Sequence, residues 1–269
     1  MTNQPLILVS RDRDAVATVT LNRPERRNAW TVPLQRAYFD TLEELDDDES
    51  VRAIVVTGAN GNFCPGADSQ ALQTYSDTGT TNPEMATISQ PEWFAATVSK
   101  PIIAAIEGMC AGVGLAQALL CDLRVAAPDT RFTTAFARRA LPPMHGMAVL
   151  LERCAGYAVA TDLLLTARTF SGEEAASLGL VHYSDEHPLE RALNLAADLA
   201  ATSAPSSMAS IKAHLLAPWL ERIVEAVTSV DESLDSVLAS PDFAEGVASL
   251  VERRPAVFPP LPSRKNTPQ

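Results

Sequence analysis

The sequence lacks closely spaced cysteines, long hydrophobic runs and an excess of positive charge, and each absence excludes a class of protein. Its four cysteines, Cys64, Cys110, Cys121 and Cys154, include no C-x-x-C pair. This spacing argues against both a zinc site and a disulfide scaffold. Of the 269 residues, 46% are hydrophobic and 20% are charged, which is typical of an ordinary globular protein rather than a disordered chain.

No stretch approaches the roughly 20 unbroken apolar residues of a membrane helix, so we expect no membrane insertion. The first residues, Met1–Pro5, lack the basic and apolar regions of a signal peptide. We therefore expect a cytoplasmic protein. The net charge of −12 makes nucleic acid an unexpected partner, because proteins that bind nucleic acid are more often basic.

Hydrophobic patterning predicts a first half of strands and turns and a second half of helices. Short apolar runs predict buried strands at 15–21, 52–57, 101–106 and 122–126. Helical patterns dominate after about residue 155, notably at 189–201, 206–216 and 220–238. The polar segment 73–90 is predicted to be a mobile surface segment that covers a ligand, and the proline-rich tail 254–269 should be irregular.

Capping residues mark three of the predicted helix starts. Thr31 precedes a helix with proline in its first turn, and Ser240 precedes Pro241 in the same way. The segment Ser171-Gly172-Glu173-Glu174 has the S-x-x-E form of a capping box.

Two turn segments, 62–68 and 107–114, each follow a buried apolar strand. Both can present free backbone N–H groups, one set from a tight turn and the other from a helix N-terminus. Two such donors that converge on one point stabilise a carbonyl oxygen as it gains negative charge. The simpler alternative is that the glycines of both turns serve packing only.

The chain resembles the enoyl-CoA hydratase/isomerase (crotonase) family over residues 15–255. Six segments carry the resemblance in the right order: 19–29 (VTLNRPERRNA), 51–68 (VRAIVVTGANGNFCPGAD), 100–115 (KPIIAAIEGMCAGVGL), 121–127 (CDLRVAA), 166–181 (TARTFSGEEAASLGLV) and 242–255 (DFAEGVASLVERRP). Six ordered segments over nearly the whole chain are far more specific than any single motif.

The resemblance implies an α/β fold, a spiral of β-β-α turns followed by a C-terminal helical trimerisation region. It divides the chain into an acyl-CoA-binding core (1–200) and a helical region with the tail (201–269). It also implies a homotrimer or hexamer and a bound acyl-CoA. No cofactor or metal is implied, because coenzyme A is part of the substrate. The thioester oxygen would lie in an oxyanion hole formed by the amides of Ala67 and Val113. Most relatives carry glycine where Val113 stands. The methyl groups of Val113 can narrow the acyl pocket.

The resemblance also places coenzyme A near the first turn and near segment 64–68. Arg26 and Arg27 are the expected phosphate ligands, because arginine suits phosphate geometrically, whereas Arg23 is expected to be structural. The other expected contacts to the substrate or coenzyme A are Ala29, Cys64, Gly66, Ala67, Asp68, Gly112 and Val113. We expect Asp68 to cap the following helix rather than to take part in catalysis.

The sequence departs from the hydratases of this family at their acid/base residues. The two glutamate positions are occupied by Ala116 and Phe136, and a further acid position of other members by Met144. Gln117 is rotated by about 100° from Ala116 along a helix, so it should not replace the missing acid. The nearest titratable group is His145, which suits acid/base work near neutral pH but is more often a packing residue. Tyr75 and Glu84 lie in the polar segment 73–90.

Several functions remain open at this point. The first is an enzyme that acts on an acyl-CoA thioester, either like a hydratase or as an isomerase or hydrolase with a different acid/base group. The second is an acyl-CoA-binding protein without turnover. A dinucleotide-dependent oxidoreductase is disfavoured, because Gln117 occupies the third glycine position of a G-x-G-x-x-G motif.

Overall fold

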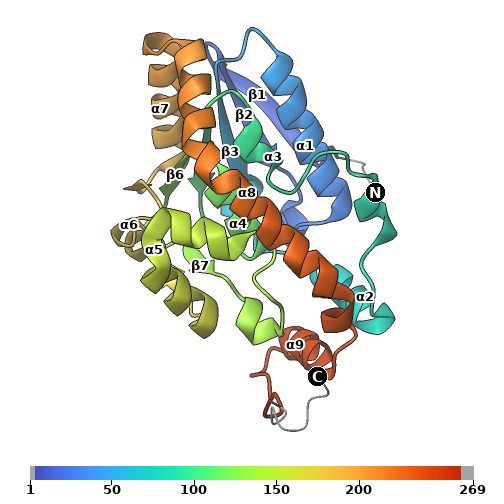
Figure 1. The fold of residues 1–269 in the computed structure, drawn as a ribbon. Helices are drawn as coiled ribbons and strands as arrows, with labels where there is room; N and C mark the ends of the chain where they lie inside the picture. The colour runs from blue at the N-terminus through green and yellow to red at the C-terminus, as the bar shows by residue number, and fades with distance from the viewer. Residues whose placement is uncertain (1–3, 262–269) are drawn as a thin grey trace.

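The structure, a computed structural model, describes residues 4–261 apart from the side chain of Asp12, and contains two β-sheets (Figure 1). The larger sheet has the strand order β1-β2-β3-β4-β6-β9, with only β1 and β2 antiparallel to each other. Its strands are β1 (Ile7–Arg13), β2 (Val16–Leu21), β3 (Ala53–Gly58), β4 (Ile102–Ile106), β6 (Leu123–Ala126) and β9 (Tyr183–Ser184). The four predicted strands are therefore confirmed, whereas β1 and β9 were not predicted.

A repeated strand-strand-helix unit connects the larger sheet to a smaller one. The smaller sheet has the order β5-β7-β8, formed by β5 (Met109–Ala111), β7 (Arg131–Thr133) and β8 (Phe170–Ser171). The chain runs from β4 through β5 into helix α4 (Val113–Leu120), and then from β6 through β7 into helix α5 (Met147–Thr166). This order is the β-β-α repeat that the family resemblance implies.

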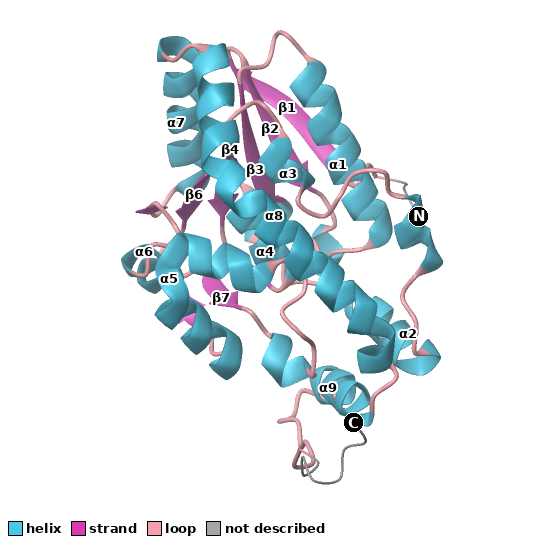
Figure 2. Cartoon of the chain, in the orientation of Figure 1, coloured by secondary structure: helices cyan, strands magenta, loops and turns pink. Residues whose placement is uncertain are grey.

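Alternating side chains of the larger sheet pack against helices on its two faces. In β3, Ala53 and Val55 belong to the cluster with helix α7 (Pro188–Thr202), whereas Ile54 and Val56 pack with helix α1 (Val32–Asp47). Figure 2 shows these two helices on opposite sides of the strands. Because successive strand residues point to opposite faces, this parallel sheet is apolar on both sides.

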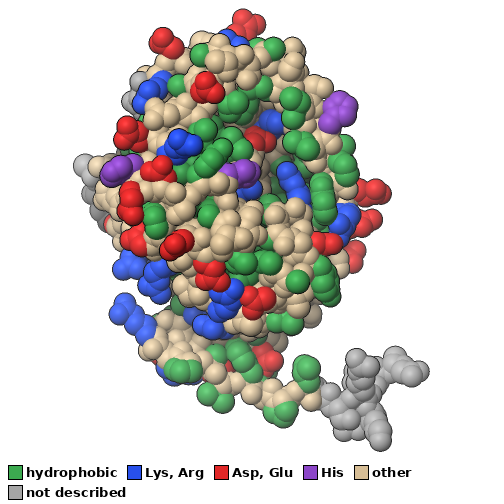
Figure 3. Space-filling view, turned by 90° about the vertical axis from the view of Figure 1, so that its left-hand side faces the viewer, with side chains coloured by type: hydrophobic (Ala, Val, Ile, Leu, Met, Phe, Trp, Pro, Cys, Tyr) green, Lys and Arg blue, Asp and Glu red, His purple; other side chains and the backbone are tan. Residues whose placement is uncertain are grey.

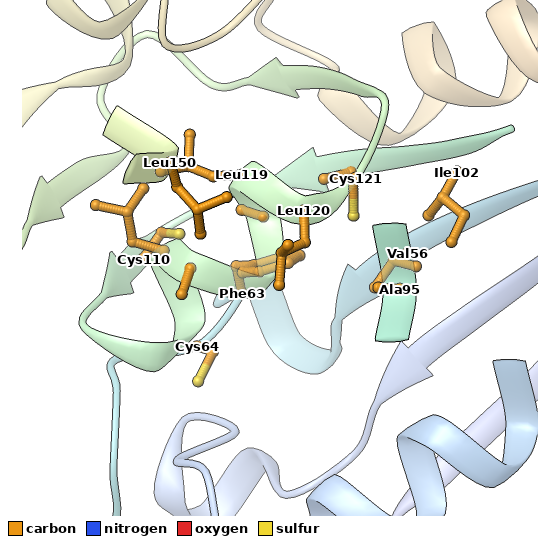
Figure 4. Packing of buried hydrophobic residues seen from close by; sticks show 14 of the residues in the cluster. Val56, Phe63, Cys64, Ala95, Ile102, Cys110, Leu119, Leu120, Cys121 and Leu150 are labelled. Carbon is orange, nitrogen blue, oxygen red and sulfur yellow. The ribbon is translucent and has the colours of Figure 1, made fainter. Parts of the chain in front are cut away.

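Helix α4 lies at the centre of the molecule, and all eight of its residues are buried. Leu119 and Leu120 lie beside Phe63, from the loop after β3, and Leu150 of α5 (Figure 4). A helix whose residues are nearly all apolar is stable only when protein surrounds it, as it does here. The buried surroundings therefore fix the position of the first residue of α4, Val113.

Side chains cap the helices at the predicted positions. The Thr31 hydroxyl accepts the amide of Leu34 at the start of α1, where Leu34, Tyr38, Leu42 and Leu45 form the buried face. The Ser171 hydroxyl accepts the amide of Glu174 at 3.0 Å, which begins α6 (Gly172–Ser177). The Ser240 hydroxyl likewise begins α9 (Pro241–Val251).

The C-terminal helices differ in part from the sequence expectation. Helix α8 runs without interruption over Pro205–Leu238 with Pro218 inside it, so the prediction of two separate helices is wrong. Figure 1 shows α8 running across the molecule towards α9. Leu216 and Ile223 of α8 pack into the same cluster as the central sheet. The division at residue 200 stays a prediction, and residues 262–269 of the tail lie outside the described residues.

The segment 73–90 is more regular than its composition predicts. Its first part belongs to helix α2 (Ser69–Thr78), and a 3-10 helix, η3, spans Pro83–Thr87. The remaining short helices are η1 (Pro24–Arg26), η2 (Ala59–Gly61), α3 (Phe94–Thr97) and η4 (Phe136–Arg139). The Arg36 side chain donates to the hydroxyl of Thr87, which ties η3 to α1.

On the face shown in Figure 3, acidic and basic side chains are interspersed with hydrophobic ones. Among residues 4–261, no helix has the length and apolar character needed to cross a membrane.

Candidate active site

A cavity of about 810 Å³ lies where the loop after β3, the start of α4 and the helices α2, α8 and α9 meet. Clefts of this size with mostly apolar walls and a few polar groups are typical of small-molecule sites. Of the predicted contact residues, Gly66, Ala67, Gly112 and Val113 line this cavity. The predicted contacts Arg26, Arg27, Ala29, Cys64 and Asp68 do not line it.

The two turn segments singled out in the sequence are hydrogen-bonded to each other. Cys64 pairs with Cys110 in a parallel bridge, in which the Cys64 amide donates to Met109 O and the Ala111 amide donates to Cys64 O. Gly66 has φ 103°, and a Cβ there would lie only 3.2 Å from Ala111 O. The sequence therefore uses glycine where one backbone closely approaches the other.

Gly114 brings the start of α4 equally close to the first segment. A Cβ at Gly114 would lie 2.4 Å from the backbone oxygen of Cys64 and 2.7 Å from its Cβ. Atoms this close would collide, so only glycine allows α4 to begin beside Cys64. The same contact places Val113 next to the loop that carries Ala67.

The amides of Ala67 and Val113 are both without an acceptor in the described part of the chain. The Trp30 amide donates to the carbonyl of Gly66, and the carbonyl of Trp30 accepts the amide of Asp68. The amide of Ala67, which lies between these two residues, takes no part in this pairing. Val113 is the first residue of α4, where an N–H group has no partner within the helix. One cavity is thus lined by two residues whose backbone donors are unpaired.

The arginines of the first turn are mostly occupied by Asp68. The Asp68 carboxylate accepts the amide of Gln70 at 2.9 Å, so its predicted role as a helix cap is confirmed. It also lies 3.2 Å from Nη2 of Arg23 and 3.3 Å from Nη2 of Arg26. Burial alone would raise the pKa of Asp68, but the Gln70 amide and the two arginines lower it overall. Arg27 is exposed and pairs with no carboxylate among residues 4–261.

The three positions at which the family carries acids are apolar here, and they lie in different surroundings. Phe136 and Met144 line the cavity, whereas Ala116 is fully buried and does not. Gln117 points elsewhere, as its helical rotation predicts. Its Nε2 donates to the backbone oxygen of Glu92 at 3.1 Å.

His145 lines the cavity and forms an ion pair with Glu92, which the sequence analysis did not identify. Its Nδ1 lies 3.0 Å from Oε2 of Glu92, and the two side chains are only 16% and 22% exposed. Glu92 lies in the loop before α3, while His145 lies in the loop before α5, next to the N-cap Gly146. His145 has φ 59°, a left-handed conformation that non-glycine residues rarely adopt.

Asp231 of α8 lines the same cavity and, with His145 and Glu92, forms a cluster of three titratable side chains. Burial lowers the pKa of His145, but the charge and hydrogen bond of Glu92 and the charge of Asp231 raise it overall. Burial raises the pKa of Glu92, yet His145 brings it below its usual value. The pKa of Asp231 is raised by partial burial and by the charge of Glu92, although His145 opposes this.

Glu92 and Asp231 were missed because no local pattern marks them. Glu92 is 53 positions from His145. Asp231 lies among exposed residues of a long helix, where an acidic side chain is ordinary. Tyr75, named in the sequence analysis, does line the cavity, whereas Glu84 does not. In the described part of the chain, no three histidine, cysteine or acidic side chains are grouped as metal ligands.

Comparison with known proteins gives one consistent family. A family model described as enoyl-CoA hydratase/isomerase matches residues 11–260. The enoyl-CoA hydratase EchA19 of Mycobacterium tuberculosis is 33% identical over 202 residues, which cover 71% of this chain and 73% of EchA19.

Solved structures of related proteins match nearly the whole chain. An enoyl-CoA hydratase/isomerase from Pseudoalteromonas atlantica matches with a TM-score of 0.82 and 29% identity, covering 95% of this chain and 100% of that one. OdaA from Pseudomonas aeruginosa matches with a TM-score of 0.82 and 27% identity, covering 93% of this chain and all of OdaA. The predicted α/β fold with its helical C-terminal region is therefore confirmed.

Proposed function

Because the chain belongs to the enoyl-CoA hydratase/isomerase family, we propose that it is an enzyme that acts on the thioester of an acyl-CoA. The substrate's carbonyl oxygen would lie between the amides of Ala67 and Val113, the oxyanion hole implied by the resemblance. The observation that carries this proposal is that both amides are unpaired and both residues line the same cavity.

The chemistry follows from where negative charge develops. Loss of a proton from the carbon next to the thioester, or attack on the conjugated double bond of an enoyl thioester, moves an electron pair onto the carbonyl oxygen. Two fixed N–H donors stabilise that charge without reorganisation, and the positive end of α4 adds to the effect. Val113 provides its N–H as glycine would, while its side chain narrows the acyl pocket.

The coenzyme A portion would lie outside the cavity, beside the first turn. Arg27 supports this placement, because it is an exposed cation without a carboxylate partner among residues 4–261. Arg26 shares Asp68 with Arg23, and its side chain is 38% exposed, so a phosphate would compete with Asp68 for it. Ala29, Cys64, Gly66 and Gly112 would contribute backbone contacts rather than charge.

The reaction need not be hydration. Hydratases of the family use two glutamates, and the corresponding positions here are Ala116 and Phe136, which transfer no protons. The protein is therefore proposed to be a lyase or isomerase of fatty acid metabolism with a different acid/base group. The second candidate, an acyl-CoA-binding protein without turnover, is favoured by the same apolar replacements.

We also infer a homotrimer or hexamer in the cytoplasm. Ile211 and Leu215 of α8 support an oligomer, because they are 58% and 64% exposed and apolar. Sedimentation that finds only a 28.8 kDa species at micromolar concentration would contradict it.

The oxyanion hole is tested by comparing Val113→Pro with Val113→Ala. Proline is tolerated at the first position of a helix, so Val113→Pro removes the N–H group while the helix remains possible. Loss of one such donor costs about 2.7–4 kcal/mol of transition-state stabilisation, a factor of about 10²–10³ in kcat. We expect Val113→Pro to be slower than Val113→Ala by that factor with crotonyl-CoA or butyryl-CoA. Equal rates would exclude the Val113 amide, and absence of acyl-CoA binding by the unaltered protein would exclude the whole proposal.

A further inference from the structure

We propose that His145 transfers the proton in this site and that Glu92 positions it, an inference that rests on the proposed function. The family glutamates are replaced by residues that carry no proton, and the ion pair of His145 and Glu92 lies in the wall of the same cavity as Ala67 and Val113.

The hydrogen bond between the two residues decides which nitrogen of His145 is available. Nδ1 of His145 lies 3.0 Å from Oε2 of Glu92, so Nδ1 carries the proton that this bond needs. In the neutral imidazole, Nε2 then has its lone pair free. Nε2 has no hydrogen-bond partner among residues 4–261. A histidine fixed through Nδ1 in this way has the arrangement of a general base.

Glu92 is itself held by the helix that begins at the oxyanion hole. The backbone oxygen of Glu92 accepts a hydrogen bond from Nε2 of Gln117 in α4 at 3.1 Å, and this bond anchors the backbone of the residue whose carboxylate contacts His145. Gln117 and Val113 lie on the same eight-residue helix. One rigid, buried element therefore sets both the proposed oxyanion donor and the carboxylate that orients His145.

His145 also has a strained backbone conformation, and the residue after it packs closely against α8. Its φ is 59°, and a Cβ on the next residue, Gly146, would lie 3.3 Å from the side chain of Ile223 in α8. Non-glycine residues in this conformation tend to occur at functional sites, where surrounding contacts compensate the strain.

The proton balance is complete without a further reactant. Neutral His145 takes a proton from the carbon next to the thioester through Nε2, which breaks a C–H bond. The electron pair of that bond moves into the enolate, whose oxygen is held by the amides of Ala67 and Val113. Glu92 balances the imidazolium that results. When the proton on Nε2 is replaced by one from solvent, its delivery to the same carbon gives exchange. In an acyl chain with a double bond next to the enolate, delivery to the far carbon of the dienolate gives isomerisation.

Two carboxylates face His145, Glu92 from the loop before α3 and Asp231 from α8. Their charges raise the pKa of His145 above its usual value, although burial acts in the opposite direction. A base with a raised pKa accepts a carbon-bound proton more readily, but it is neutral only at higher pH. Proton exchange should therefore rise with pH through a midpoint above about 6.5, the usual pKa of histidine.

A purely structural role for the pair predicts different behaviour. In that case the ion pair joins two loops, and its loss lowers stability while the pH dependence of proton exchange stays the same. The variant His145→Asn separates these roles, because its side-chain amide replaces Nδ1 and keeps a donor for Glu92. It has no group at the place of Nε2.

The experiment measures exchange of deuterium from D₂O into the acyl chain of butyryl-CoA by mass spectrometry, together with the dissociation constant of butyryl-CoA. We expect His145→Asn to lose about 10²-fold or more in exchange rate, the usual range for a general base, with affinity within a few-fold. His187→Ala, on the exposed loop before α7, serves as the matched control and should exchange at the original rate. Added imidazole should partly restore exchange in His145→Ala.

Glu92→Gln tests the positioning role. It removes the charge that raises the pKa of His145, so the midpoint of the pH–rate profile should move to lower pH. An unchanged midpoint overturns the role of Glu92. Exchange at the original rate in His145→Asn overturns the role of His145 and leaves the proposed function intact. An unaltered protein that binds butyryl-CoA without exchange overturns the inference. If it also fails to convert crotonyl-CoA, the enzyme is overturned as well and the binding protein remains. Absence of binding overturns the proposed function itself.

Discussion

Arg23 and Asp68 are 45 positions apart in the sequence, yet Nη2 of Arg23 lies 3.2 Å from Oδ2 of Asp68. The Asp68 side chain is only 4% exposed, and that of Arg23 is 17% exposed. The pair joins the turn after β2 to the start of α2. It therefore helps to fix the loop that carries Ala67.

Removal of the Asp68 carboxylate should destabilise the protein strongly. Asp68→Ala removes the helix cap and leaves Arg23 without its carboxylate, so we expect the free energy of unfolding to fall by about 3 kcal/mol. Asp68→Asn keeps an acceptor for the Gln70 amide and should cost less. Urea denaturation followed by circular dichroism measures both. Equal losses in the two variants would show that the charge contributes nothing.

The same carboxylate predicts a dependence on pH. The pKa of Asp68 is lowered in the folded protein, so its charge stabilises the fold above its unfolded pKa of about 3.9. This contribution is lost as the pH falls through the folded pKa. The difference in unfolding free energy between the unaltered protein and Asp68→Asn should be constant from pH 7 to 5 and shrink below pH 4. A difference that grows on acidification would contradict the assignment.

Gly114 should not tolerate alanine. Its Cβ would lie 2.4 Å from Cys64 O, and neither backbone can move without disturbing the bridge between Cys64 and Cys110. We expect Gly114→Ala to lose about 1–3 kcal/mol of stability, the usual cost of overpacking, and to lose acyl-CoA turnover as α4 shifts. Gly61→Ala is the control, because a Cβ added at Gly61 would meet no atom of the described residues within 4 Å, and only the φ of 66° is unfavourable. Thermal melting compares the two.

How far the sequence predicts the molecule depends on whether a feature is local. The strands 52–57 and 101–106 were predicted because each is a continuous apolar run, and both are buried on both faces. β1 was missed because its residues Ile7–Arg13 begin with three apolar residues and continue with four polar or charged ones, so neither a sustained apolar run nor an alternation marks this edge strand. β1 is defined by its antiparallel pairing with β2, which begins after a turn of two residues, rather than by its own composition.

The candidate site likewise contains residues that a local motif identifies and residues that only a contact between distant segments identifies. Ala67 and Val113 were found from glycine-containing segments that matched a family pattern, and the structure places both residues in one cavity wall. Glu92 was missed because its role depends on a contact with His145 across 53 positions. A sequence motif records neighbours along the chain, whereas this ion pair is formed by two loops that α4 and α8 bring together.

Helix α8 should become more stable when Pro218 is replaced. Proline in a helix interior lacks the N–H that would bond four residues back and costs about 3 kcal/mol relative to alanine. Pro218 is exposed, so its replacement disturbs no core contact. Because alanine also increases the freedom of the unfolded chain, we expect Pro218→Ala to gain about 1–2 kcal/mol in urea denaturation. A loss of stability would show that the helix needs a bend at this position.

The ion pair of His145 and Glu92 should stabilise the fold most strongly in mildly acidic solution. The folded pKa of His145 is raised, so its contribution is full below the unfolded value of about 6.5 and is lost as the pH rises through the folded pKa. The folded pKa of Glu92 is lowered, so its contribution is full above its unfolded value of about 4.3 and is lost as the pH falls through the folded pKa. Glu92→Gln should therefore be most destabilising between about pH 4.3 and 6.5, with smaller effects on either side. Urea denaturation across this range tests it, with Glu84→Gln, in the exposed part of η3, as a control for loss of a surface carboxylate. A Glu92→Gln effect that stays the same from pH 4 to 9 would mean that the two side chains do not form an ion pair in solution.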